Sequence, residues 1–264
     1  MIELIELDGN DWEFRDSRAS SLDDELDRGI DFFGEGQFQL GETFFREIIE
    51  THPYHIDALH HLSILYEDTS REFEAYLCAR EAVRIGLSAI PKEFSWTTSK
   101  LDWGFLDNRP FLRAYYNLGL HLKRRNEIDE AMEIFSRMLS VCPNDNLGVR
   151  YLLPELWFAK GDISSVIRLC ENYRDDISPE IMYTHPLALI LAGQFDKART
   201  LLMEAKSQLP LVAKELKKKR HTEPKSTTDW GVFMGSAEHA YEYWLQYGKY
   251  WLASKDAMTL IASI

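Results

Sequence analysis

Residues 111–143 hold two blocks of apolar side chains at three- and four-residue steps, separated by the polar turn 125–127. Spacing of this kind predicts two amphipathic helices joined as a hairpin. A hairpin cannot cover both of its apolar faces by itself, so it is stable only when similar units pack against it. This stretch therefore predicts an all-α chain built by stacking helical hairpins.

The same pattern occurs earlier in the chain at a fixed offset of 90 residues. Seven positions of the repeat pattern recur at this offset in the two stretches. The earlier set is Gly29, Phe32, Gly36, Phe38, Gly41, Phe45 and Pro53, and the later set is Gly119, Leu122, Asn126, Ile128, Ala131, Phe135 and Pro143. A fixed offset over this many positions indicates internal repeats.

The order of large, small and aromatic residues in the central hairpin resembles that of the tetratricopeptide repeat (TPR). The residues that carry the likeness are Tyr115, Leu118, Gly119, Leu122, Ala131, Phe135 and Pro143. The resemblance implies a TPR-like helical-hairpin solenoid of about five hairpins. Residues 101–120 and 142–157 also resemble segments of uncharacterised bacterial TPR proteins, which implies the same architecture and no further activity.

Repeat arithmetic divides the chain into segments. An offset of 90 residues equals two repeats of about 34 residues plus about 22 more, so one further repeat and an insertion are expected between the two matching stretches. We expect the solenoid to span residues 21–210, with an ordered insertion at 90–110 that contains Trp96, Trp103 and Phe105. Residues 211–264 are expected to form a basic connector and C-terminal capping helices.

Residues 1–20 are acidic, and their short apolar–acidic alternation fits either a strand or a solvated lead-in; we favour the lead-in. Several residues should define helix ends. Ser21 is expected to be the N-cap of the first helix, and Ser178, followed by a proline, that of the fifth repeat. Ser236 should cap the last helix, and Pro154 should kink the helix that contains it.

Composition and net charge indicate the cellular compartment and the class of partner to expect. The net charge of −13 disfavours general binding to nucleic acid, because phosphate repels an acidic chain. The three cysteines are widely spaced, and the N-terminus lacks a secretory pattern. No apolar run is long enough to span a membrane. We therefore expect a cytoplasmic protein with no membrane contact.

TPR proteins generally bind peptides or partner proteins in a concave groove lined by the first helix of each hairpin. Carried over by register, the resemblance implies these groove residues: Asp57, His60, Arg113, Tyr116, Lys123, Arg150, Trp157 and Tyr183. The Lys/Asn clamp that holds chaperone C-terminal tails is absent, because the equivalent places hold His60 and Ile64, or Tyr116 and Leu120. The expected partner is a protein or peptide, and the arginines favour an acidic one.

Alternative interpretations remain open. Arg109 and Arg150 could be internal struts that tie the insertion to the helices. Histidines cluster between residues 52 and 61, but adjacent histidines on a helix point about 100° apart, so we expect no metal site and no cofactor. The basic segment 214–225 could associate weakly with nucleic acid.

No catalytic motif stands out, so we expect a protein-interaction scaffold rather than an enzyme. The alternative is a small-ligand binder or an enzyme whose pocket lies between the aromatic insertion and the hairpins.

Overall fold

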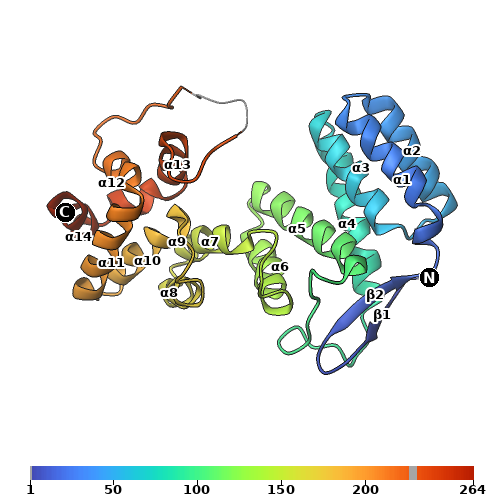
Figure 1. Ribbon diagram of the computed structural model, residues 1–264, viewed down its shortest axis with the longest axis horizontal. Coiled ribbons are helices and arrows are strands. Elements are labelled where there is room, and N and C mark those ends of the chain that lie inside the picture. Colours follow the sequence, from blue (N-terminus) through green and yellow to red (C-terminus); the bar gives the residue numbers. More distant parts are fainter. Residues whose placement is uncertain (1, 226–230) are drawn as a thin grey trace. The chain divides into compact units, whose positions relative to one another are not determined.

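A computed structural model describes residues 2–225 and 231–264 (Figure 1). Residues 226–230 of the expected connector lie outside the described residues. The chain divides into two compact units, Met1–Val149 and Arg150–Ile264, which we call unit 1 and unit 2. Within the described residues, no helix is long and apolar enough to cross a membrane.

Unit 1 is built mainly from six helices. They are α1 (Asp23–Gly34), α2 (Phe38–Thr51), α3 (Ile56–Asp68), α4 (Glu72–Ser88), α5 (Arg109–Arg124) and α6 (Ile128–Val141). Consecutive helices pack as hairpins, α1 with α2, α3 with α4 and α5 with α6, and α3 also packs against α5 (Figure 1). This arrangement confirms the expected TPR-like solenoid.

The glycines at the small position of the repeat allow the helices of a hairpin to approach closely. A Cβ atom at Gly29 would lie 2.6 Å from Cε1 of Phe45, and one at Gly119 would lie 2.5 Å from Cε1 of Phe135. Both phenylalanine rings are fully buried. Since a packed interior leaves no room for a displaced ring, the matched glycine and phenylalanine positions have a direct structural reason.

The N-terminal residues form a β-hairpin, β1 (Ile2–Glu6) and β2 (Trp12–Asp16), in which Leu4 faces Phe14. The side chain of Asn108 holds this hairpin: its Oδ1 accepts from the Phe14 N–H at 2.9 Å, and its Nδ2 donates to the Trp12 carbonyl at 2.9 Å. Trp12 and Phe14 are buried. The strand alternative thus describes residues 2–16, and the solvated lead-in favoured from the sequence was wrong.

The insertion expected at residues 90–110 is ordered, as its aromatic content suggested. It runs from the end of α4 to the short turn η2 (Leu106–Asn108) that precedes α5. Lys100 donates its N–H to the Asn10 carbonyl at 2.7 Å and accepts from the Trp12 N–H at 2.9 Å. The ring of Trp96 packs against Phe94 and Tyr115. The insertion therefore connects the β-hairpin to the helices.

One helix start in unit 1 was predicted wrongly. The structure begins α1 at Asp23, with Leu22 as N-cap and no capping side chain. Ser21 lies in the preceding turn η1 (Ala19–Ser21), and its hydroxyl donates to the Arg18 carbonyl at 2.7 Å. Because that hydroxyl bonds backward along the chain, it does not cap the helix.

Unit 2 continues the helical pattern with shorter helices. They are α7 (Leu153–Lys160), α8 (Ile163–Asn172), α9 (Pro179–Met182), α10 (Thr184–Leu191), α11 (Phe195–Gln208), α12 (Pro210–Leu216), α13 (Ala237–Ala253) and α14 (Lys255–Ser263), with the turn η3 (Val149–Tyr151) before them. Helices α7 and α8 pack as a hairpin, as do α10 and α11. Helix α13 packs on α12, and Tyr243, Tyr247 and Trp251 are fully buried.

The predicted helix ends of unit 2 have mixed outcomes. Ser236 caps α13, since its side chain accepts from the His239 N–H, and Ser178 is the N-cap of α9. The prediction that Pro154 kinks its helix was wrong, because this proline lies in the first turn of α7. A first-turn residue has no helical acceptor for its N–H, so a proline there starts a helix without bending it.

Candidate functional site

The partly exposed side chains of α3 and α5 form one surface of unit 1. On α3 they are Asp57, His61, Ile64 and Glu67, and on α5 they are Arg113, Tyr116, Leu120 and Lys123. Their spacing of three or four residues places each set along one side of its helix. Because α3 and α5 pack side by side, we call this set the α3/α5 face.

Ion pairs join the two helices across the α3/α5 face. The Nη2 atom of Arg113 lies 2.7 Å from Oδ2 of Asp57, and Arg124 pairs with Glu67. Burial raises the pKa of Glu67, while the charge of Arg124 acts in the opposite direction. Arg113, which the sequence assigned to the groove, and Arg124 are therefore matched by acidic residues of the neighbouring helix.

A buried polar ladder lies beneath this face. The Nδ2 atom of Asn117 donates to Oγ of Ser63 at 3.0 Å, and the Ser63 hydroxyl donates to the Ala75 carbonyl at 2.8 Å. The Nε2 atom of His121 lies 3.4 Å from the same hydroxyl. Burial and the adjacent Arg124 lower the pKa of His121 to about 4, so its ring is neutral at pH 7. These bonds hold α3, α4 and α5 in a fixed register.

The sequence assigned His60 to the groove, but the partly exposed histidine of α3 is its neighbour, His61. His60 is only 6% exposed, and burial lowers its pKa to about 3. His61 is partly exposed, with its Nε2 3.7 Å from Oδ1 of Asp57. The two rings are adjacent in sequence but point in different directions. Among the residues that the structure describes, no group of three or more His, Cys, Asp or Glu could hold a metal ion.

The predicted residues of unit 2 do not form an open surface together. Tyr183 is fully buried, and its hydroxyl donates to the Leu209 carbonyl at 2.8 Å. The Nε atom of Arg150 lies 2.6 Å from Oδ2 of Asp176, and its guanidinium lies over the ring of Tyr151. These contacts of Arg150 are not with the insertion, as the strut interpretation required. Arg109 has the expected geometry, because its Nε donates to the carbonyl of Trp103 in the insertion at 3.0 Å. Trp157 is partly exposed on α7.

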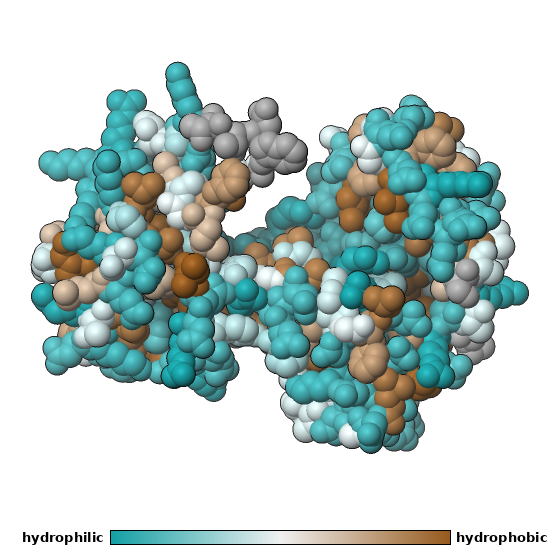
Figure 2. Space-filling model, viewed as in Figure 1, coloured by the Kyte–Doolittle hydropathy of each residue, from teal (hydrophilic) through white to brown (hydrophobic). Residues whose placement is uncertain are grey.

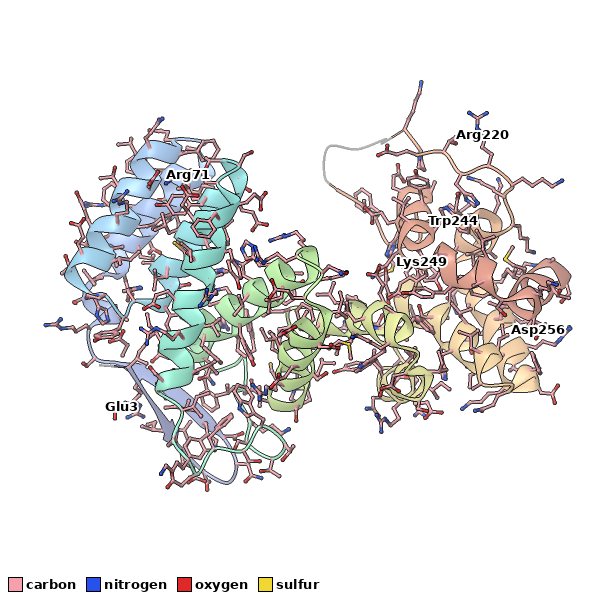
Figure 3. All side chains as sticks on the ribbon, turned by 180° about the vertical axis from the view of Figure 1, so that it is seen from behind. Glu3, Arg71, Arg220, Trp244, Lys249 and Asp256 are labelled. Atoms are coloured by element: carbon pink, nitrogen blue, oxygen red, sulfur yellow. The ribbon has the colours of Figure 1, made fainter. Side chains whose placement is uncertain are left out.

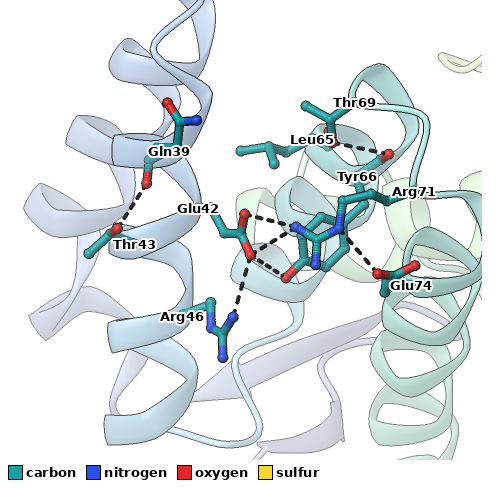
Figure 4. A network of polar contacts seen from close by, with 9 residues as sticks. All are labelled: Gln39, Glu42, Thr43, Arg46, Leu65, Tyr66, Thr69, Arg71 and Glu74. Atoms are coloured by element: carbon teal, nitrogen blue, oxygen red, sulfur yellow. Dashed lines mark hydrogen bonds and ion pairs between the residues drawn. The ribbon is translucent and has the colours of Figure 1, made fainter.

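A polar network that the sequence did not indicate joins α2, α3 and α4 (Figure 4). Glu42 accepts from the Tyr66 hydroxyl at 2.9 Å and from Nη1 of Arg71 at 2.9 Å. The Arg71 guanidinium also stacks 3.9 Å from the centre of the Tyr66 ring. Burial would raise the pKa of Glu42, but the hydrogen bonds from Tyr66 and Arg71 outweigh it and lower that pKa. The network links the first two hairpins.

The basic segment 214–225 is partly anchored to its own unit. Glu215 is 3% exposed; it pairs with Lys218, and its Oε1 lies 2.9 Å from Nδ1 of His221. The His221 ring stacks on Trp244 of α13 with 3.5 Å between the ring centres. Figure 3 labels Trp244 and, on the chain beyond α12, Arg220, which is exposed.

Two cavities bear on the small-ligand alternative. The cavity beside Trp103 of the insertion encloses about 10 Å³, which is at the lower limit for one water molecule. A larger cavity of about 410 Å³ lies in unit 2, lined by α8 to α11 and including His185. In the view of Figure 2, hydrophilic side chains predominate, and apolar residues gather in small groups. The cavity beside Trp103 is therefore too small for an organic ligand.

Comparison with known proteins identifies a family over most of the chain. A family model described as "Tcf25: Transcriptional repressor TCF25" matches residues 40–246 of the 264. No curated protein matches the chain.

Solved structures with a similar fold are TPR proteins. The crystal structure of MamA protein has a TM-score of 0.53 and 16% identity, covering 78% of this chain and 100% of that chain. The structure of YrrB, described as a TPR protein with an unusual peptide-binding site, has a TM-score of 0.53 and 13% identity, covering 74% of this chain and 93% of that chain. At these identities the likeness concerns the fold, which is the TPR solenoid.

Proposed function

The chain belongs to the Tcf25 family, and on that basis we propose that it is a non-catalytic scaffold that binds a peptide or partner protein. The α3/α5 face is the proposed contact surface. The similarity in fold to YrrB, a protein described as having a peptide-binding site, supports a peptide segment as the ligand. The family description as a transcriptional repressor is consistent with a protein that acts by bringing other proteins together.

The observation that carries this proposal is the mixture of side chains on the α3/α5 face. Ile64, Tyr116 and Leu120 are partly exposed apolar groups, and they lie among charged residues that are already held in place. Side chains ordered before binding lose little conformational entropy when a partner arrives. Tyrosine and arginine are also the residue types that contribute most to protein interfaces.

Arg113 gives the surface its preference for an acidic partner segment. A guanidinium has five N–H donors, and about a third of the Arg113 side chain stays exposed beside Asp57. A partner carboxylate can therefore share the exposed part of this guanidinium with Asp57. Lys123, one turn beyond Leu120, extends the same charge along α5.

The proposed surface differs from the groove implied by the sequence. His60 and Tyr183 are left out because both are buried. Arg150 and Trp157 remain candidate contacts within unit 2, but the proposal does not require them.

The test is affinity purification from the native cell followed by mass spectrometry, with Arg113→Glu plus Tyr116→Ala in α5. The expected result is loss of partners that the unaltered chain recovers. A matched control is Arg199→Glu plus Phe195→Ala on α11, which makes the same charge reversal and also truncates an aromatic side chain, at exposed positions of unit 2. A second variant, Leu120→Ser, breaks no ion pair and should weaken the same partners.

Two results would contradict the proposal. The α5 variants could recover the same partners as the control, or only nucleic acid could be recovered. Binding through Lys217, Lys219 and Arg220 would weaken steeply with salt, which distinguishes it from a peptide complex.

A further inference from the structure

Helix α13 carries apolar side chains on both its inner and its outer side. Its inner side is occupied, because Tyr243, Tyr247 and Trp251 are fully buried within unit 2. On the outer side, Leu245 and Leu252 are 64% and 59% exposed. They lie about two helical turns apart, so both project from the same side of α13. A surface helix normally presents polar residues outward, so this pair of leucines marks a contact surface.

The spacing along the outer side is that of a contact between two helices. Tyr241, Leu245, Gly248 and Leu252 follow one another at the alternating steps that define the core positions of paired helices. Tyr241 is partly exposed. The Trp244 ring lies over Gly248, where an added Cβ would be 2.6 Å from Cε3 of the indole, so apolar surface continues between the two leucines. We call Tyr241, Leu245, Gly248 and Leu252 the α13 stripe.

Two opposite charges lie along one edge of the α13 stripe. Glu242 directly follows Tyr241, and Lys249 directly follows Gly248, so the two charges share an edge at different heights. Glu242 is exposed. The Lys249 side chain (Figure 3) stays 59% exposed, although its Nζ lies 3.3 Å from Oε1 of Glu155. In paired helices, charges at these flanking positions decide the partner and its orientation.

A two-fold rotation makes this edge complementary to itself. When two copies of α13 pair in antiparallel orientation about a point between Leu245 and Gly248, Leu245 meets Gly248 of the second copy. In the same arrangement, Leu252 meets Tyr241 of the second copy, and Glu242 meets its Lys249. Each contact then occurs twice, as in any two-fold interface. A parallel pair would instead bring like charges together, which costs stability.

We propose that the α13 stripe binds the same stripe of a second copy of this chain, antiparallel and about a two-fold axis. The apolar residues alone would accept many helices, but the order of the two charges fits the chain's own rotated copy. Helix α13 has 17 residues and is about 25 Å long, so the contact is smaller than a standard interface and association is expected in the micromolar range. The inference does not depend on the α3/α5 face, which lies in unit 1.

The experiment is sedimentation velocity of the full chain over the micromolar to sub-millimolar range. The unaltered chain should show an equilibrium between monomer and dimer. Leu245→Glu should leave only monomer, because two carboxylates without partners would enter the apolar contact. The matched control is Met203→Glu, which adds the same charge at a position of α11 that is 56% exposed and should dimerise like the unaltered chain. Circular dichroism verifies that both variants fold.

Charge reversals test the two-fold arrangement itself. Glu242→Lys and Lys249→Glu should each weaken the dimer about tenfold, because each change turns two attractions into two repulsions. Both changes in one chain should restore the dimer, since the edge is then complementary to itself again. An equimolar mixture of the two single variants should also form a heterodimer, because one chain carries only lysines on this edge and the other only glutamates.

The proposal is overturned if the chain stays monomeric at every concentration, or if Leu245→Glu and Met203→Glu associate equally well. It is also overturned if the combined charge reversal does not restore the association that the single reversals weaken. Arg113→Glu plus Tyr116→Ala, the variant that tests the α3/α5 face, should dimerise normally. Loss of the dimer in that variant would place the self-contact on α5 and refute the proposal for α13.

Discussion

The contact between Gly119 and Phe135 allows a sharp test of the repeat packing. In Gly119→Ala the new Cβ would lie 2.5 Å from Cε1 and 2.8 Å from Cζ of Phe135, and 3.2 Å from Cγ2 of Ile134. Phe135 has no exposed surface, so its ring cannot move toward solvent. Overpacking of a core in this way costs about 1–3 kcal/mol.

A second effect opposes the first. Alanine favours a helix over glycine by about 1 kcal/mol, and Gly119 lies inside α5. Two ring atoms within 3 Å of the new Cβ place the steric cost near the upper end of its range. We therefore expect a net loss of about 2 kcal/mol, which corresponds to a fall in Tm of about 4–8 °C for a chain of this size.

The assay is thermal unfolding followed by circular dichroism, with hydrogen exchange of peptides from α5 and α6 to localise the effect. Hydrogen exchange is needed because a chain with two units need not unfold in one step. The matched control is Gly34→Ala in the last turn of α1, where a Cβ would meet nothing within 4 Å. That change should leave Tm unchanged or slightly raised. Equal stability of the two variants would refute the packing argument.

Two further predictions concern buried hydrogen bonds. Tyr183→Phe leaves the buried Leu209 carbonyl without its donor and should cost about 1–3 kcal/mol in thermal unfolding, without changing partner recovery; lost partners at unchanged stability would contradict this. Because the folded pKa of Glu42 is lowered from 4.5, its contribution to stability is present above that pH and is lost as the pH falls through the folded value. Urea unfolding of Glu42→Gln should therefore depend less on pH between about pH 5 and pH 3 than unfolding of the unaltered chain, and equal dependence would count against the network.

Part of the candidate surface could be read from the sequence. Register along each helix placed Asp57, Arg113 and Tyr116 correctly on partly exposed sides of α3 and α5. The same reasoning chose His60 over His61, since a step of one residue on a helix is a rotation of about 100° and a register estimate is no finer than that. It also could not show that Arg113 meets Asp57, because the pair joins residues 56 positions apart.

A cavity of about 210 Å³ beneath the β-hairpin, lined in part by Asp16, Asp23, Asp57 and Asp107, had no sequence signal of its own. Its four aspartates belong to β2, α1, α3 and the turn before α5, and each has a local explanation as a helix-start or turn residue. Only the packing of β2 against Asn108 brings these segments to one place.

The sequence by itself determined that this chain is a stack of helical hairpins. Apolar periodicity and the paired glycine and phenylalanine positions are local properties, and a hairpin with two apolar faces has few other ways to be stable. Tertiary structure alone decided which charged groups pair, which histidine is buried, and that the N-terminal residues form strands. Those outcomes depend on contacts between residues far apart in the chain, which no local pattern encodes.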